Sequence, residues 1–490
     1  TQMKYKFLES LNLDSVVYKR LSLFLDNVVS GSENIVLSPL CNRIDPDSIL
    51  SGWDKVFNAN SIEINDALNT LELQNRDKFG PRSVAVPWIL RSDSVNEYFS
   101  TKYHSIPDFQ IDPNKRLRPM TTDQAMGFLK NNTNSGLPFL GRKSEFKDIV
   151  LSEFDSLLAR QDPCVMFTRT QEDKKTRTVW GYPMADTLNE MRFYRPLLQY
   201  QKELTWRRSL GGPLSVDQKI TELILDSDPI KVSIDFSAYD SSIDETLQLK
   251  SFQYIDNLFQ SRFSDEIDYI RKRFNTIGLI TPDGIKDGPH GVPSGSTFTN
   301  EVDSITQYLI ARSIGIPENK FDVQGDDGAY SVQNSDVLFE GFKNYGLEVN
   351  EDKSHVSEDY VVYLQNLHHK DYVRNGMFAG IYPTYRALNR IVYPERFNEF
   401  SADGIEGSDY FSIRTISILE NCRNHPLFVE FVKYVVSLDA YGLSFSQSGL
   451  IKYIQRINQA SLSEDFLNFR YEDNVKGINT FETVKVLKEL

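Results

Sequence analysis

Phe321-Asp-Val-Gln-Gly-Asp-Asp-Gly-Ala-Tyr330 is the stretch around which the chain is organised. A short apolar run with Phe321 and Val323 enters a Gly/Asp turn, and a second short run leaves it. Two strands joined by such a turn predict a β-hairpin. The tip carries Asp326 and Asp327, and neighbouring carboxylates on a rigid turn are hard oxygen ligands suited to Mg²⁺ or Mn²⁺. Because Asp is also an ordinary turn former, the rest of the chain has to decide between a site and a plain turn.

A second pair of carboxylates lies upstream. Ile230, Val232 and Ile234 alternate with polar residues, which predicts a strand that ends at Asp235, with this side chain pointing away from the apolar face. Asp240 follows where the chain turns into a helix. The two carboxylates either belong to a site or serve as a strand end and a helix cap.

A Gly/Pro/Ser-rich loop starts at Gly288 and leads into a helix. Small residues at a helix start leave backbone N–H groups free to bind a ligand. Thr299 and Asp303 are four residues apart, so they share one face of this helix. A capped helix after an ordinary loop is the alternative, but it does not explain why so many small residues precede the helix.

The strongest basic cluster lies between Phe167 and Val179. It consists of Arg169, Lys174, Lys175 and Arg177. Arginine forks and lysine point charges suit phosphate. In a strand, Lys175 and Arg177 would share one face and Lys174 would lie on the other. The alternative is a solvated hairpin with Glu172 in its turn.

Another small-residue loop, Thr133-Asn-Ser-Gly-Leu-Pro-Phe139, precedes this cluster. Gly and Pro in a loop allow a backbone to approach a ligand closely, although a surface turn has the same composition. Lys353 lies in a polar turn after a short predicted strand. The pair His368-His369 has no Cys or third His nearby, so we expect surface positions and no metal.

The two ends of the chain carry no evident chemistry. We expect residues 1–118 to be a packing or bridging extension and the region beyond 371 to be mostly helical. Its apolar stripe predicts an amphipathic core helix and comprises Phe428, Phe431, Val432, Val435 and Val436.

Bulk properties set further bounds. The 490 residues have a net charge of −14, which argues mildly against nucleic-acid binding unless a basic channel lies inside. No apolar run approaches the length of a membrane span, and the start of the chain lacks a signal-peptide pattern. Cys41, Cys164 and Cys422 are far apart, which favours a reducing compartment and no zinc site.

Taken in order, these segments resemble the motif series of viral RNA-dependent RNA polymerases over residues 130 to 390. In that resemblance Thr133, Ser135, Gly136 and Pro138 belong to the template loop. The basic cluster lies over the incoming triphosphate. Asp235 and Asp240 resemble the first palm motif, and Ser294, Gly295 and Thr299 the second. Gly325-Asp326-Asp327 resembles the third, Lys353 belongs to the fourth, and Tyr363 to Lys370 resembles the primer grip.

Two segments resemble those of polymerases from bisegmented double-stranded RNA viruses. They are Val-Trp-Gly-Tyr-Pro after the basic cluster and Gly-Val-Pro-Ser-Gly-Ser before the helix. Picobirnavirus polymerases are the group most resembled, with partitivirus enzymes as neighbours. In one respect the chain departs from many positive-strand enzymes. They carry Asn nine residues after the motif Ser, where this chain has Asp303, while Asn300 lies one turn earlier. Either residue could therefore read the ribose.

The resemblance implies a mechanism of template-directed nucleotidyl transfer with two Mg²⁺ or Mn²⁺ ions, and initiation without a primer. Asp235 and Asp326 would bind the ions, with Asp327 secondary. Lys353 would protonate the leaving pyrophosphate. Asp240 and Ser294, with Asn300 or Asp303, would sense the 2′-hydroxyl.

The resemblance also implies an α+β fold: a closed right hand whose palm is an antiparallel sheet with flanking helices. The expected divisions are an extension (1–118), fingers (119–230 and 249–290), palm (231–248 and 291–370), and thumb with tail (371–490). Expected partners are the RNA template, the product duplex, nucleoside triphosphates and the capsid interior. We expect a monomer with no membrane contact, located in the virion interior and the host cytoplasm.

Three other classes of protein share some of these features. A reverse transcriptase also binds its metal ions through carboxylates, but Gly325 and the pair Asp240 and Ser294 favour RNA synthesis. A non-catalytic RNA-binding or inner-capsid protein should have lost Asp235, Asp326 or Lys353, and the chain retains all three. A Mg²⁺ hydrolase leaves the basic cluster unexplained.

Overall fold

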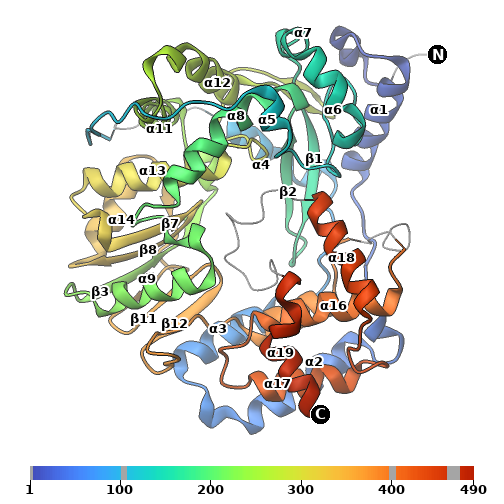
Figure 1. Ribbon diagram of the computed structural model, residues 1–490, viewed down its shortest axis with the longest axis vertical. Coiled ribbons are helices and arrows are strands. Elements are labelled where there is room, and N and C mark those ends of the chain that lie inside the picture. Colours follow the sequence, from blue (N-terminus) through green and yellow to red (C-terminus); the bar gives the residue numbers. More distant parts are fainter. Residues whose placement is uncertain (1–3, 101–106, 397–403, 461–474) are drawn as a thin grey trace.

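The computed structural model of the chain describes residues 4–100, 107–396, 404–460 and 475–490. Parts of the predicted extension (1–3 and 101–106) and of the predicted thumb and tail (397–403 and 461–474) lie outside the described residues. Helices and antiparallel strands alternate along the chain, and the region after 371 is mostly helical, as predicted (Figure 1).

The central sheet has four antiparallel strands in the order β10-β3-β8-β7. They are β3 (Ile230–Ile234), β7 (Phe321–Gln324), β8 (Asp327–Val332) and β10 (His355–Ser357). The alternating run therefore forms the predicted strand, and the stretch from Phe321 forms the predicted hairpin. Two further pairs border this sheet: β4 (Phe236–Ser237) with β9 (Glu348–Val349), and β11 (Tyr360–Tyr363) with β12 (Asn366–His369).

Helices cover one face of the central sheet and bury a large apolar core. This layer comprises α10 (Tyr239–Ser242), α11 (Glu245–Leu258), α13 (Thr299–Ser313) and α14 (Ser335–Asn344). Val302 and Phe342 from these helices belong to the same core cluster as Val323 from β7. On the other face, α9 (Pro213–Leu225) packs with β11, and Ile220 shares a core cluster with Ala329.

A second sheet, in the order β2-β1-β5-β6, lies apart from the first. Its strands are β1 (Cys164–Thr170), β2 (Thr176–Gly181), β5 (Leu279–Thr281) and β6 (Gly284–Lys286). The surrounding helices are α4 (Ser92–Asn96), α5 (Thr122–Met126), α6 (Lys143–Ser152), α7 (Phe154–Ala159), α8 (Met184–Gln201) and α12 (Ser264–Thr276).

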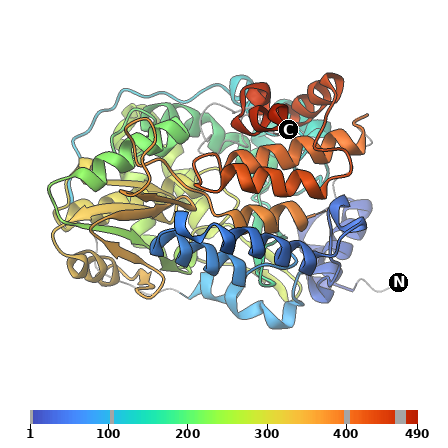
Figure 2. The ribbon, with the colours of Figure 1, turned by 90° about the horizontal axis from the view of Figure 1, so that it is seen from below.

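The N-terminal segment contacts both the second sheet and the C-terminal helices. Helix α1 (Ser15–Ser30) packs on β1, while α2 (Pro46–Ala59) packs on the C-terminal helices and α3 (Asp66–Asp77) on the first of them (Figures 1 and 2). Those helices are α15 (Thr384–Val392), α16 (Gly407–Glu420), α17 (Phe428–Leu438), α18 (Gln447–Ala460) and α19 (Glu482–Glu489). Trp53 of α2 meets Phe431 of α17 with ring centroids 4.8 Å apart. The predicted apolar stripe is therefore a face of a core helix, and the N-terminal segment contacts both the second sheet and the C-terminal helices.

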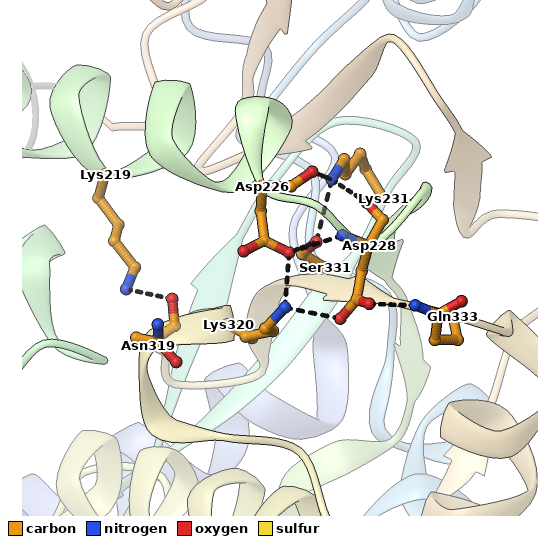
Figure 3. A network of polar contacts seen from close by, with 8 residues as sticks. All are labelled: Lys219, Asp226, Asp228, Lys231, Asn319, Lys320, Ser331 and Gln333. Atoms are coloured by element: carbon orange, nitrogen blue, oxygen red, sulfur yellow. Dashed lines mark hydrogen bonds and ion pairs between the residues drawn. The ribbon is translucent and has the colours of Figure 1, made fainter.

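A polar network fastens the start of β3 (Figure 3). Lys231 is buried and donates hydrogen bonds to the backbone carbonyls of Asp226 and Asp228 and to Ser331 Oγ on β8. Lys320 Nζ lies 2.9 Å from a carboxylate oxygen of each aspartate. These contacts hold the end of the sheet opposite to the Asp326 hairpin tip.

Two further predictions can be compared with this fold. His368 is buried on β12 and donates its Nδ1 proton to the Phe378 carbonyl, 2.8 Å away, so the predicted surface position is wrong for this residue. The three cysteines form no disulfide. Among the helices that the structure describes, none is both long and apolar enough to cross a membrane.

Candidate active site

The hairpin of β7 and β8 turns through two residues. Gln324 pairs with Asp327, which leaves Gly325 and Asp326 at the tip. Gly325 has a φ of +62°, a left-handed conformation that glycine adopts without strain. The tip therefore presents Asp326 outward, with Asp327 at the first position of β8.

Helix α13 holds this tip by its backbone. Gln307 Nε2 donates to the carbonyl oxygens of Gly325 (2.8 Å) and Asp327 (3.1 Å), and Ser304 Oγ accepts the Gly325 N–H at 2.8 Å. The Gln307 side-chain oxygen accepts the Tyr330 hydroxyl at 2.7 Å. Three backbone groups of the turn thus have fixed partners, and the hairpin carboxylates have a rigid support.

Strand register brings Asp235 to the same place. Ile234 is the last residue of β3 and pairs with Gly328, so Asp235 continues toward Asp327. Its backbone N–H donates to Ser354 Oγ at 2.9 Å. Burial raises the pKa of the Asp235 carboxyl, although the positive charge of Lys353 acts against this.

The two hairpin carboxylates have different surroundings. Asp326 keeps solvent access at the tip, yet the protein atoms around it and the charge of Asp240 raise its pKa, against the effect of Arg177. Asp327 accepts the Leu364 N–H at 2.9 Å. Burial and the charge of Asp326 raise the pKa of Asp327 to about 7. The negative charge of each carboxylate thus acts on its neighbours at the hairpin tip.

The chemistry of this donor set fits Mg²⁺ or Mn²⁺, because Asp235, Asp326 and Asp327 offer only oxygen. Across the described ranges, no three His, Cys, Asp or Glu side chains converge closely enough to hold a metal by themselves. Mg²⁺ at these carboxylates would therefore need water or phosphate oxygens to complete its shell.

A second group of polar side chains surrounds Asp240 on α10. Ser294 Oγ donates a short hydrogen bond to Asp240 Oδ2. Asp303 is 5% exposed; burial, Asp240 and Asp326 raise its pKa well above the ordinary value. Within the described residues, Asp303 Oδ1 and Asn300 Nδ2 are buried without a hydrogen-bond partner. The four predicted ribose-reading residues thus share one neighbourhood, and two of them keep an unused polar atom.

The loop before α13 is held tightly. Gly295 has a φ of +152°, and a Cβ there would lie 2.1 Å from the Trp180 carbonyl oxygen. Thr299 Oγ1 donates to the Pro293 carbonyl at 3.0 Å. On the next residues, Glu190 of α8 accepts the Ser296 hydroxyl (2.6 Å) and the Thr297 N–H (3.0 Å).

The basic cluster forms the β1–β2 hairpin. Arg169 pairs with Arg177 across the strands, but Lys174 and Lys175 lie in the turn, so their predicted placement on opposite faces of a strand is wrong. Lys174 has a φ of +57°. Asp173 also has a positive φ, of +59°, so the backbone turns at these two residues and the strand does not continue through them.

Contacts of this hairpin close the molecule into a ring. Glu172 lies 3.8 Å from Arg82 of the N-terminal segment and 3.8 Å from Arg386 of α15. Arg169, with its side chain 57% exposed, lies 3.3 Å from Glu395. Arg169 and Glu172 thus join the hairpin to the N-terminal and C-terminal regions.

The remaining predicted residues lie around this centre. Lys353 is exposed in the turn after β9, and its charge and that of Lys175 both act on Asp235. In the predicted template loop, Ser135 is buried and Thr133 accepts a hydrogen bond from Lys143 Nζ at 2.7 Å. The bond between Leu137 and Pro138 is cis, and a Cβ on Gly136 would lie 2.3 Å from the Tyr182 carbonyl oxygen.

Sequence reasoning missed several residues of the site. Tyr98 from the N-terminal segment contacts Ser294, and Gln307 and Glu190 support the hairpin and the loop. Lys78, at the end of α3, adds positive charge near Asp235. No local signal could have found Tyr98 or Lys78, because their partners lie more than one hundred residues away.

Comparisons with known proteins show which proteins this chain resembles. The potential RNA-dependent RNA polymerase of a human picobirnavirus (strain Human/Thailand/Hy005102/-) is 27% identical over 522 residues, covering 96% of each protein. The RNA-directed RNA polymerase of Cryptosporidium parvum virus 1 is 23% identical over 285 residues, covering 50% of this chain and 53% of that protein.

The crystal structure of the RNA-dependent RNA polymerase of a human picobirnavirus matches with a TM-score of 0.78, 24% identity and 96% coverage of both chains. This confirms the predicted mixed α+β polymerase fold. The family described as viral RNA-dependent RNA polymerase matches residues 91–377, which is more than half of the sequence. The chain therefore belongs to the viral RNA-dependent RNA polymerases.

Proposed function

We propose that the chain copies RNA of a double-stranded RNA virus by template-directed nucleotidyl transfer, in replication and in transcription. The observation that supports this most directly is the strand register, which brings Asp235 from β3 beside Asp326 and Asp327 from the hairpin. Phosphoryl transfer by in-line displacement needs carboxylates gathered in this way from separate elements.

Asp235 and Asp326 would hold Mg²⁺ or Mn²⁺, with Asp327 as a secondary ligand. Bound there, two ions would stabilise charge on the attacking and leaving oxygens. Asp327 is secondary because the Leu364 N–H already occupies one of its oxygens.

The basic residues would handle the triphosphate. In the reaction the 3′-hydroxyl oxygen bonds to the α-phosphorus, and the bond to pyrophosphate breaks. Arg169, Lys174, Lys175 and Arg177 offset the charge on the departing phosphates. Lys353, exposed and near Asp235, supplies a proton to the pyrophosphate.

Ribose recognition would fall to the cluster at Asp240. Ser294 is bonded to Asp240, while Asp303 Oδ1 and Asn300 Nδ2 are polar atoms that a ribose hydroxyl could satisfy. We include both Asn300 and Asp303, because each has one buried polar atom without a hydrogen-bond partner among the described residues. Thr133, Ser135, Gly136 and Pro138 would line the template path, with Gly295 and Thr299 shaping the loop above the nucleotide.

The resemblance of the sequence to picobirnavirus polymerases supports four finer points of the proposal. Synthesis starts without a primer. The divisions are the extension, fingers, palm and thumb at the boundaries predicted above. The chain acts as a monomer beside the template and the product duplex. It works in the virion interior, against the capsid, and in the host cytoplasm.

The test is incorporation of labelled nucleotides on a single-stranded RNA template with Mg²⁺ or Mn²⁺ and no primer. The native chain is compared with Asp326→Asn and with Asp336→Asn, a control carboxylate exposed at the start of α14. We expect product from the native chain and the control only. Product from Asp326→Asn as well would contradict the metal assignment. Product that appears only after a primer is added would contradict unprimed initiation alone.

A further inference from the structure

The N-terminal segment reaches into the ribose neighbourhood. The short helix η5 (Glu97–Phe99) lies on the loop that carries Ser294, where the Tyr98 hydroxyl is 3.3 Å from Ser294 Oγ. The Tyr98 carbonyl also accepts the Gly291 N–H at 2.8 Å. A segment expected only to bridge thus touches the predicted nucleotide-binding residue Ser294 through its side chain, and the same loop at Gly291 through its backbone.

Rings fix the position of this tyrosine. The Tyr98 ring lies 5.6 Å from that of Trp180 on β2, and Phe99 stacks on the same indole at 6.0 Å. The backbone N–H of Trp180 in turn donates to the Ser294 carbonyl at 2.9 Å. Because ring and backbone are both held, the phenol oxygen is aimed at one place.

The direction of the hydrogen bonds follows from the number of protons. Ser294 has one hydroxyl proton, and it is donated to Asp240. The Tyr98 hydroxyl must therefore donate to Ser294. This leaves Ser294 Oγ with one free lone pair and a fixed rotamer, which suits it to accept a hydrogen bond from a ribose hydroxyl.

We propose that Tyr98 is a positioning residue for ribose selection, which holds Ser294 in the rotamer that bonds Asp240 and offers its free lone pair to the 2′-hydroxyl of the incoming nucleotide. The inference rests on the proposed function of Asp240 and Ser294. Loss of the phenol hydroxyl frees the Ser294 rotamer, while the ring contacts with Trp180 stay. A neutral hydrogen bond of this kind contributes about a 2- to 10-fold preference.

The experiment measures kcat/KM for ATP and for 2′-deoxy-ATP opposite a templating uridine, with the full chain. Tyr98→Phe should lower the preference for ATP roughly 2- to 10-fold, mainly by slowing ATP. Tyr372→Phe is the matched control, because its hydroxyl also ties the N-terminal segment to the rest of the chain, through the Asn65 N–H (2.8 Å) and the Glu63 carbonyl (3.0 Å). The control should keep the native preference.

Two companion variants separate the possible failures. Tyr98→Phe combined with Ser294→Ala should show the preference of Ser294→Ala alone, because Tyr98 acts through Ser294. An equal slowing of both nucleotides in Tyr98→Phe would reduce Tyr98 to a structural role and overturn the inference. An unchanged preference in Tyr98→Phe, with a lowered one in Ser294→Ala, would overturn it while the ribose assignment stands. An unchanged preference in Ser294→Ala would overturn the ribose assignment itself.

Discussion

Replacing Glu190 by Gln should flatten the pH dependence of stability between about pH 5 and pH 8. Glu190 is buried, and burial raises the pKa of its carboxyl from 4.5 to about 8, with hydrogen bonds from Ser296 and Thr297 acting against the rise. The charge of Asp186 raises the pKa further and that of Arg273 lowers it. The carboxyl is therefore protonated in the folded chain at neutral pH.

The sign of the effect follows from proton binding. Below pH 4.5 the carboxyl is protonated in both the folded and the unfolded chain, so it does not change the free energy of unfolding. Between pH 4.5 and about 8 the unfolded chain has released a proton that the folded chain keeps, so the free energy of unfolding falls as pH rises. At about 1.4 kcal/mol per pKa unit, the whole shift amounts to roughly 5 kcal/mol.

Thermal melting is the assay. With an unfolding entropy of about 2.1 cal/mol/K per residue, this chain has roughly 1 kcal/mol/K, so the effect is about 5 °C in Tm. The native Tm should fall by about that much more than the Tm of Glu190→Gln between pH 5 and pH 9. Gln keeps an acceptor for the Thr297 N–H and an amide for Ser296, so the variant should fold. Plots of Tm against pH that run parallel for the two proteins would refute the reasoning.

Glu420 offers a matched control for activity. It is also buried, and it accepts the Glu482 N–H (3.0 Å) and the Thr483 N–H (3.1 Å) at the start of α19, in the C-terminal bundle. Glu420→Gln should leave nucleotide incorporation unchanged. Glu190→Gln should lower it, because Glu190 holds the loop beside Ser294.

Three further changes have definite expected outcomes. Gln307→Leu removes the donor for two buried carbonyl groups of the hairpin, so the free energy of unfolding in urea should fall by about 1–3 kcal/mol, with a loss of incorporation; unchanged activity would contradict the support role. Gly295→Ala would place a Cβ 2.1 Å from the Trp180 carbonyl oxygen and should abolish incorporation. The control is Gly315→Ala at an exposed position, where the added Cβ would meet nothing within 4 Å, although the φ of +90° costs some stability. Burial opposes the shift, but hydrogen bonds from Lys320, the Asp228 N–H and Ser331 lower the pKa of Asp226 to about 2. The contribution of Asp226 is thus lost as pH falls from 3.8 toward about 2, so Asp226→Asn should destabilise the chain at pH 6 and much less at pH 2, measured by acid-unfolding fluorescence.

Local patterns predicted the elements that position the chemistry. The alternation of Ile230, Val232 and Ile234 marks β3, and Asp235 follows its end because a strand pattern fixes which residue comes last. The Gly325-Asp326 turn was predictable for the same reason, since turn chemistry depends on neighbours in sequence.

Contacts between distant segments had no such signal. Lys231 belongs to the polar face of β3, yet it is buried, because Asp226, Asp228 and Ser331 satisfy its ammonium group. Tyr98 meets Ser294 across 196 residues, and Glu190 meets Ser296 across 106. Periodicity reports which face of an element is apolar, but the partner of a buried polar group depends on the packing of whole elements.

The ring formed by the N-terminal segment, the β1–β2 hairpin and the C-terminal helices has two seams of unlike chemistry. At the hairpin, Glu172 and Arg169 join the ring through partly exposed charges 3.3–3.8 Å from their partners. At the other seam, Trp53 is fully buried against Phe431. Salt screens the charge–charge interactions of Glu172 and Arg169, whereas it leaves the apolar contact of Trp53 with Phe431 unchanged or strengthens it. Rising salt should therefore weaken the contacts of Glu172 and Arg169 with the C-terminal region while the contact between Trp53 and Phe431 stays intact.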